Sequence, residues 1–131
     1  MWACYEGHIG VVQVLLDRGA VVHTKALLGS TAVHLAADGG RVEIIRMLVN
    51  HGANVKARDD LGRSALHRCC SRGHHVLAKI LLEYGLDVNE KTVRQNTPIS
   101  LAAEGAHIET VRVLILGGAE LNNTPDYGGW Y

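Results

Sequence analysis

Residues 62–89 of the chain, GRSALHRCCSRGHHVLAKILLEYGLDVN, contain a pattern that returns along the whole sequence. A glycine follows each Leu-rich segment at steps of 33 residues, and no insertion or deletion interrupts the register. These glycines are Gly19, Gly52, Gly85 and Gly118. A fixed period of about 20–50 residues is the signature of a solenoid, in which each unit packs only on its neighbours. The period therefore predicts a stacked array rather than one self-contained globule.

Each unit is predicted to form two short helices joined by a glycine-containing break. Thr31, Ser64 and Thr97 carry the hydroxyl that an N-cap needs to satisfy free amides of a first helical turn. His34 and His67 follow three residues later, at the position from which a side chain can reach back to the cap. The segment that follows has a wide apolar stripe, which is typical of a helix packed between neighbours. The glycine that closes each unit suits the left-handed residue after a helix.

These motifs, in this register, resemble the ankyrin repeat. Residues 97–103 (TPISLAA) and 64–67 (SALH) look like its Thr-Pro-Leu-His box, and residues 85–89 (GLDVN) look like its Gly-Ala-Asp-Val-Asn segment. The resemblance covers the whole chain and implies an all-α ankyrin-repeat solenoid of stacked helix-turn-helix units with β-hairpin or loop fingers. The departures are local, because alanine replaces the box proline in two units and Gln95 stands where two sister units have a hairpin glycine.

The register divides the chain into units of one ankyrin repeat domain over residues 1–131. We expect a partial repeat at 1–25, repeats at 26–58, 59–91 and 92–124, and the start of a further repeat at 125–131. Met1 aligns with His34, so the first unit starts inside its first helix. The apolar segment 11–16 lacks the polar outer face that a terminal repeat needs. We therefore expect a fragment of a longer array, with intramolecular contacts to flanking repeats.

The composition narrows the possible functions. The chain has 13 basic and 13 acidic residues, so it is not a wholesale polyanion binder, and it has no Phe, so its core must use Leu, Val, Ile and Ala. No apolar run approaches the roughly 18 residues that span a bilayer, and residues 1–8 have no basic stretch followed by an apolar one, so we expect no signal peptide. Three cysteines form no disulfide framework. We expect no membrane insertion and an intracellular protein, cytoplasmic or nuclear.

The densest cluster of reactive side chains is Cys69, Cys70, His74 and His75. The register places both cysteines at small packing positions and His74 at the start of a second helix, and the usual zinc-ligand spacing is absent. His75 replaces an apolar residue of the sister units, so we expect it to be partly exposed or paired with an acceptor. Spacing alone leaves a Cys–His nucleophile open, but no phosphate loop or hydrolase motif occurs. We expect no enzymatic activity, no cofactor and no metal site.

By the resemblance, binding belongs on the concave surface that fingertips and first helices line. Leucines at one fingertip are contact candidates, although they could instead fold back on the next finger. Arginines are the second feature, and Arg68 stands where Leu35 and Leu101 hold the equivalent position. The alternative is local pairing of these arginines with Asp59, Asp60 and Glu90. The predicted partner-binding residues are Leu27, Leu28, Arg58, Asp60, Leu61, Arg63, Arg68, Arg72, Lys91, Arg94 and Tyr127.

The zero net charge hides a gradient along the array. Residues 26–58 carry four basic and two acidic side chains, whereas residues 92–131 carry two basic and four acidic ones. This gradient favours a protein partner that presents an acidic or C-terminal peptide segment to the middle units and a more basic element to the last one. The resemblance also suggests asparagine hydroxylation at Asn89 and Asn122, each two residues after an acidic residue.

We therefore expect a protein–protein interaction module, a scaffold or an adaptor. One rival function is a regulatory segment of a larger enzyme, a ubiquitin-ligase adaptor or an ion channel. Another is nucleotide or oligonucleotide binding through the arginine-rich face. Nucleic acid is the less favoured partner, because few aromatic side chains are present to stack on bases.

Overall fold

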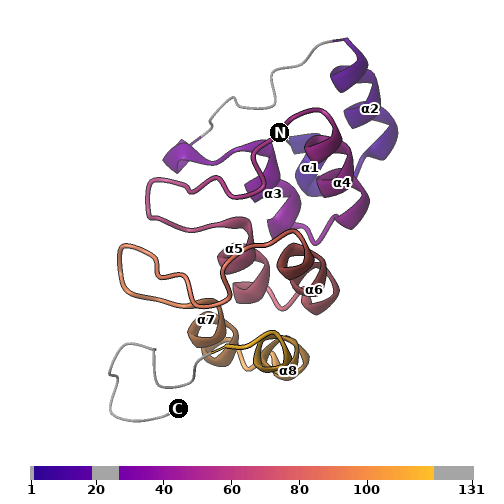
Figure 1. The fold of residues 1–131 in the computed structure, drawn as a ribbon. Coiled ribbons are helices and arrows are strands. Elements are labelled where there is room, and N and C mark those ends of the chain that lie inside the picture. Colours follow the sequence, from indigo (N-terminus) through magenta and orange to yellow (C-terminus); the bar gives the residue numbers. More distant parts are fainter. Residues whose placement is uncertain (1, 19–26, 120–131) are drawn as a thin grey trace.

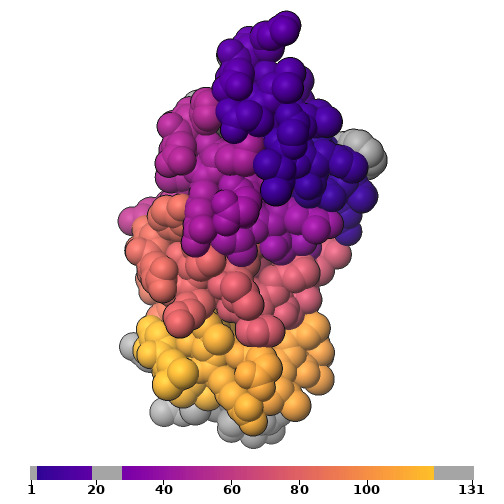
Figure 2. Space-filling model, turned by 90° about the vertical axis from the view of Figure 1, so that its right-hand side faces the viewer, coloured from indigo at the N-terminus to yellow at the C-terminus, as the bar shows by residue number. Residues whose placement is uncertain are grey.

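The helices of successive units form two layers in the computed structural model, which describes residues 2–18 and 27–119. The first helices are α1 (Trp2–Glu6), α3 (Ala32–Asp38), α5 (Ala65–Ser71) and α7 (Pro98–Glu104). The second helices are α2 (Ile9–Asp17), α4 (Val42–Asn50), α6 (His75–Glu83) and α8 (Ile108–Leu116). Figure 1 shows the two layers side by side, and Figure 2 shows the units stacked in chain order in one column. The predicted all-α array is confirmed.

Long loops project from the first-helix layer and form fingers on one side of the array (Figure 1). We call residues 27–30 the second finger, which includes a short 3₁₀ turn (Leu27–Gly29), residues 58–63 the third finger and residues 91–96 the fourth finger. The N–H of Asp60 donates to the carbonyl of Leu28 (2.9 Å), and the N–H of Val93 donates to that of Leu61 (3.0 Å). Within the described ranges the fingers contain no β-strand, so these contacts join loops rather than hairpins.

The first helices begin with the reciprocal cap that the sequence predicts. At the start of α5, the N–H of Ser64 donates to Nδ1 of His67 (3.1 Å), and the N–H of His67 donates to Oγ of Ser64 (3.4 Å). Thr97 and Ser100 exchange the same two bonds at the start of α7. At the start of α3, the N–H of Thr31 again donates to the ring of the residue three positions later. The caps satisfy amides that a helix end leaves free.

The two capping histidines also bond the loops that follow α4 and α6. Because Nδ1 of His34 and of His67 accepts a backbone N–H, Nε2 carries the proton and donates. His34 donates to the carbonyl of Arg63 (3.0 Å), and His67 donates to that of Glu90 (2.6 Å). Burial of both rings lowers the pKa of each histidine below the ordinary value of 6.5, which keeps the rings neutral.

A second set of bonds between units starts the second helices. It runs from Arg41 Nε to the carbonyl of Tyr5 (3.0 Å), from His74 Nε2 to that of Asp38 (2.8 Å) and from His107 Nε2 to that of Ser71 (3.1 Å). These bonds recur at steps of 33 residues. They explain the glycine before α2, α4 and α6, since a Cβ at Gly73 would lie 2.5 Å from Nδ1 of His107.

The core between the layers is thin and aliphatic. Ile44, Ile45 and Leu48 of α4 are fully buried, as are Leu77 and Leu81 of α6. The three cysteines are also buried and unpaired, as the register predicts. Burial raises the pKa of the Cys69 thiol well above its ordinary value, so this side chain behaves as a small apolar residue.

Candidate functional site

The tips of neighbouring fingers expose apolar side chains side by side. Leu28 is 51% exposed and Val93 is 62% exposed, while Leu61 between them is partly buried. The two backbone bonds between fingers hold these residues in adjacent loops. We call Leu28, Leu61 and Val93 the fingertip ridge. Leu28 therefore remains available for contact, and the side chain of Leu27 lies outside what the structure describes.

The third finger is built around a buried carboxylate. Oδ1 of Asp59 accepts the N–H groups of Leu61 (2.9 Å) and Arg63 (2.9 Å), and Oδ2 accepts from Nε of Arg63 (2.7 Å). Burial by itself would raise the pKa of Asp59, but the bonds and charge of Arg63 and the N–H of Leu61 outweigh it and lower the pKa below its ordinary value. Asp59 therefore stays ionised and fixes the turn that presents Leu61.

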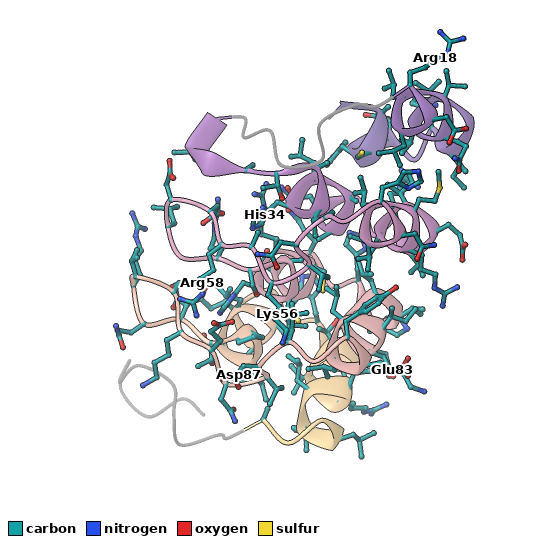
Figure 3. All side chains as sticks on the ribbon, turned by 45° about the horizontal axis from the view of Figure 1, so that its top comes forward. Arg18, His34, Lys56, Arg58, Glu83 and Asp87 are labelled. Atoms are coloured by element: carbon teal, nitrogen blue, oxygen red, sulfur yellow. The ribbon has the colours of Figure 1, made fainter. Side chains whose placement is uncertain are left out.

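Two of the candidate arginines pair within the chain. Arg63 lies against Asp59 with about a third of its side chain exposed. Arg58 forms an ion pair with Glu90, and both side chains are partly exposed. In Figure 3, Arg58 lies on the finger side of the helices, whereas Glu83 lies on the opposite side, on α6. The local pairing that the sequence left open is thus observed for both arginines.

The expectation that Arg68 is exposed on the binding face is wrong. Only 10% of its side chain is exposed, because the guanidinium turns inward from α5 toward α3 and the fingers. It forms an ion pair with Asp38 and lies 3.5 Å from Oδ2 of Asp59, and it donates to Oγ of Ser30 (2.6 Å). Asp38 is buried as well. Arg68 therefore has its partners inside the protein.

The remaining basic candidates are more accessible. Arg72 and Arg94 are exposed, and Lys91 is partly buried. None of the three forms an ion pair with any residue in the described part of the chain. Asp60 is exposed at the third fingertip. The accessible surface thus combines an apolar ridge with two exposed guanidinium groups.

The predicted modification sites are only partly described. Asn89 follows α6 and is partly buried, and its amide donates to the carbonyl of Gly118 (3.5 Å). Its hydroxylation stays a prediction. Asn122 and the predicted contact residue Tyr127 lie outside the described residues.

The sequence held one unused signal for the buried pair. Arg68 replaces a leucine of the sister units, and Asp38 stands where the sister units have Tyr5, Ser71 and Glu104. Charged departures of opposite sign in adjacent units indicate a pair across the unit boundary. The register places each residue on its helix, but it does not by itself predict that the side chains of Arg68 and Asp38 are in contact.

Within residues 2–18 and 27–119, no group of three or more His, Cys, Asp or Glu side chains is placed to hold a metal ion. His75 is exposed, which is one of the two placements expected for it. No helix in this part of the chain is long and apolar enough to cross a membrane.

Comparison with known proteins identifies the repeat. A family model described as ankyrin repeats, in three copies, matches residues 1–92 and residues 57–125. Comparison with curated proteins gave no match.

Proposed function

The chain belongs to the ankyrin repeat family, and on this premise we propose that its fingers and first helices form a surface that binds one protein partner. Ankyrin repeats are in general protein–protein interaction modules and are typically not catalytic. The finer proposal is a scaffold or adaptor role in which the fingertip ridge makes the central contact.

The fingertip ridge is the observation that carries the proposal. Leu28 in the second finger and Val93 in the fourth finger are each more than half exposed, on either side of the third finger with Leu61. Neither residue is required by the helix core, because sister positions hold polar side chains such as Asp60 and Arg94. Contiguous exposed apolar side chains with a polar rim are typical of protein interaction sites.

The two exposed candidate arginines without a carboxylate partner in the described part of the chain favour a partner with an acidic element. Arg72 and Arg94 are exposed and have no carboxylate partner among the described residues, and arginine is enriched at the centres of interfaces. An acidic or C-terminal segment would supply carboxylates that arginine can bind in bidentate fashion. Arg58, Arg63 and Arg68 pair with carboxylates of this chain, which leaves few cations to bind nucleic acid phosphates.

The test compares one finger-side variant with one matched variant on the opposite face. Leu28→Asp/Arg94→Glu removes an apolar side chain and a cation from two fingers. Val76→Asp/Lys79→Glu makes the same changes on α6, where both residues are exposed. A protein captured by the wild-type chain is purified. Its affinity for the wild type and for each of the two double variants is then measured by calorimetry.

We expect the finger-side variant to bind at least about tenfold more weakly, since central interface residues contribute about 2 kcal/mol or more. The α6 variant should bind as the wild type does. Circular dichroism establishes that both variants are folded. An α6 variant that loses binding while the finger-side variant retains it would place the interface on the other face and refute the proposal.

A further inference from the structure

Arg68 makes contacts with three separate elements. Its Nε donates to Oδ1 of Asp38 on α3 (3.1 Å), and its Nη2 bonds the second oxygen of the same carboxylate. Its Nη1 donates to Oγ of Ser30 in the second finger (2.6 Å) and lies 3.5 Å from Oδ2 of Asp59 in the third finger. We call Ser30, Asp38, Asp59 and Arg68 the Arg68 cluster. One side chain on α5 thus contacts a first helix and two fingers.

The Arg68 cluster is buried, and each of its members is at most 9% exposed. Burying charges removes their hydration, so a buried ion cluster is weak evidence for stability and is often replaceable by apolar residues of similar volume. The chain itself shows such replacements, because the fourth unit has Leu101 at the position of Arg68 and Thr92 at that of Asp59. Stacking of the units therefore does not require the cluster.

Two members of the Arg68 cluster belong to the fingers that carry Leu28 and Leu61. Ser30 lies two residues after Leu28, at the end of the second finger. Asp59 receives the N–H of Leu61 and so fixes the turn of the third finger. The N–H of Asp60 donates to the carbonyl of Leu28, which joins the same two fingers near their tips. The two fingers are thus linked at their tips by the backbone and at their bases by Arg68.

We propose that Arg68 is a positioning residue for the binding surface: through Ser30 and Asp59 it holds the second and third fingers as one rigid element that presents Leu28 and Leu61 to the partner. The consequence for binding rests on the function proposed above. Loops that are already ordered lose less conformational entropy on association, so a fixed pair of fingers binds its partner more tightly than a mobile pair.

The test exchanges the cluster for the residues that sister units carry. Arg68→Leu, Asp38→Ser and Asp59→Thr place the residues found at 101, 71 and 92 at the equivalent positions. The triple variant leaves no buried charge without a partner, and Arg63 is exposed enough to be hydrated. Hydrogen exchange of backbone amides is measured on the whole chain without any partner, together with the unfolding midpoint.

We expect the triple variant to unfold close to the wild-type midpoint. The amides of Asp60 and Leu61 should exchange at least tenfold faster than in the wild type, because their loops lose the anchor at the base. The amides of Arg94 and Asn96, which bond Oγ1 of Thr92 in the fourth finger, serve as internal references and should change little. Unchanged exchange at Asp60 and Leu61 would overturn the proposal.

Two further variants separate positioning from loss of stability. Leu114→Ala weakens the core of α8, far from the cluster, and should speed exchange only through global unfolding. The two variants are compared after urea has brought the triple variant to the stability of Leu114→Ala. If the amides of Asp60 and Leu61 then exchange equally fast in both, the proposal fails. If the triple variant does not fold, Ser30→Ala removes only the hydroxyl that accepts from Arg68 and no charged side chain, and Asp60 must still exchange faster. Because no partner is present, failure here is distinct from failure of the proposed function.

Discussion

The third and fourth fingers adopt the same turn but hold it with different side chains. In the third finger, Oδ1 of Asp59 accepts two backbone N–H groups at 2.9 Å each. In the fourth finger, Oγ1 of Thr92 accepts the two equivalent groups at 3.3 and 3.2 Å. A neutral hydroxyl is therefore sufficient to form the turn. The negative charge of Asp59 has a different use, because its second oxygen faces Arg63 and Arg68.

The first helices that follow these two fingers also differ in a side chain, the third residue after the N-cap. His67 caps α5 and reaches the carbonyl of Glu90 in the following loop. Ser100 caps α7, but its hydroxyl donates to the carbonyl of Thr97 at the start of its own helix (2.8 Å). The cap residue of α5 is thus long enough to reach the loop after α6, whereas the cap residue of α7 is short and bonds only at the start of its own helix.

The largest expected effect tests the buried charge of the third unit. Arg68→Leu leaves Asp38 without a cation and Asp59 with Arg63 alone. Removing one partner of a buried ion pair costs about 3–5 kcal/mol, so we expect a loss of that size in the free energy of unfolding. Urea unfolding followed by circular dichroism measures it.

The mirror change in the fourth unit sharpens the same comparison. Leu101→Arg puts a guanidinium beside Ser71 and Thr92, which offer no carboxylate, and it should also destabilise the protein. If Arg68→Leu lowers the stability by less than about 1 kcal/mol, the buried cluster is not what distinguishes the third unit.

Substitution of the capping residues His67 and Ser100 should have the next largest effect on the free energy of unfolding. His67→Ala empties a fully buried ring site and leaves the carbonyl of Glu90 and the N–H of Ser64 without their partner. A cavity and lost bonds together should cost about 2–3 kcal/mol. Ser100→Ala removes only the two local bonds to Thr97 and should cost about 1 kcal/mol. Equal losses in denaturant unfolding would show that the bond from His67 to Glu90 contributes nothing.

Much of this fold followed from the sequence, because the period of 33 residues transfers local chemistry from unit to unit. Helix positions, caps and buried cysteines all recur at equivalent positions, so one unit predicts the next. The Arg68 cluster could not be found this way. Its members occupy different positions of the unit, and Arg68 contacts Asp38 and Ser30 from 30 and 38 residues away along the chain. A period describes what units share, whereas this cluster depends on how the third unit departs from them.

The histidine caps predict a dependence on pH that a hydroxyl cap lacks. Burial lowers the pKa of His34 and His67 in the folded state, so the unfolded chain binds more protons just below the ordinary value of 6.5. Stability should therefore fall as the pH drops below about 6.5, by up to about 1.4 kcal/mol per pH unit for each histidine, until the folded pKa is passed.

Unfolding midpoints measured between pH 7 and pH 5 test this dependence. His34→Ser/His67→Ser places the hydroxyl of Ser100 at both equivalent positions and should flatten the profile. Asp59 does not affect the profile in this range. Because its pKa is lowered in the folded state, its stabilisation is complete at higher pH and is lost only as the pH falls below the ordinary value of 3.8. A profile that is equally steep in the double variant would assign the dependence to other groups.

The smallest effect concerns the backbone of the two fingers. Gly62 in the third finger and Gln95 in the fourth occupy equivalent positions, with φ of 74° and 67°. This left-handed region strains a side chain, but glycine gains more freedom when the chain unfolds, so Gln95→Gly should raise the free energy of unfolding by only about 0.5–1 kcal/mol. The reverse change, Gly62→Gln, should cost more than that, because a Cβ there would also lie 3.1 Å from the backbone N of Val93. Both are measured by denaturant unfolding. If Gln95→Gly destabilises the protein, the Gln95 side chain makes a contact that offsets its strain, and the fourth finger is held by more than Thr92.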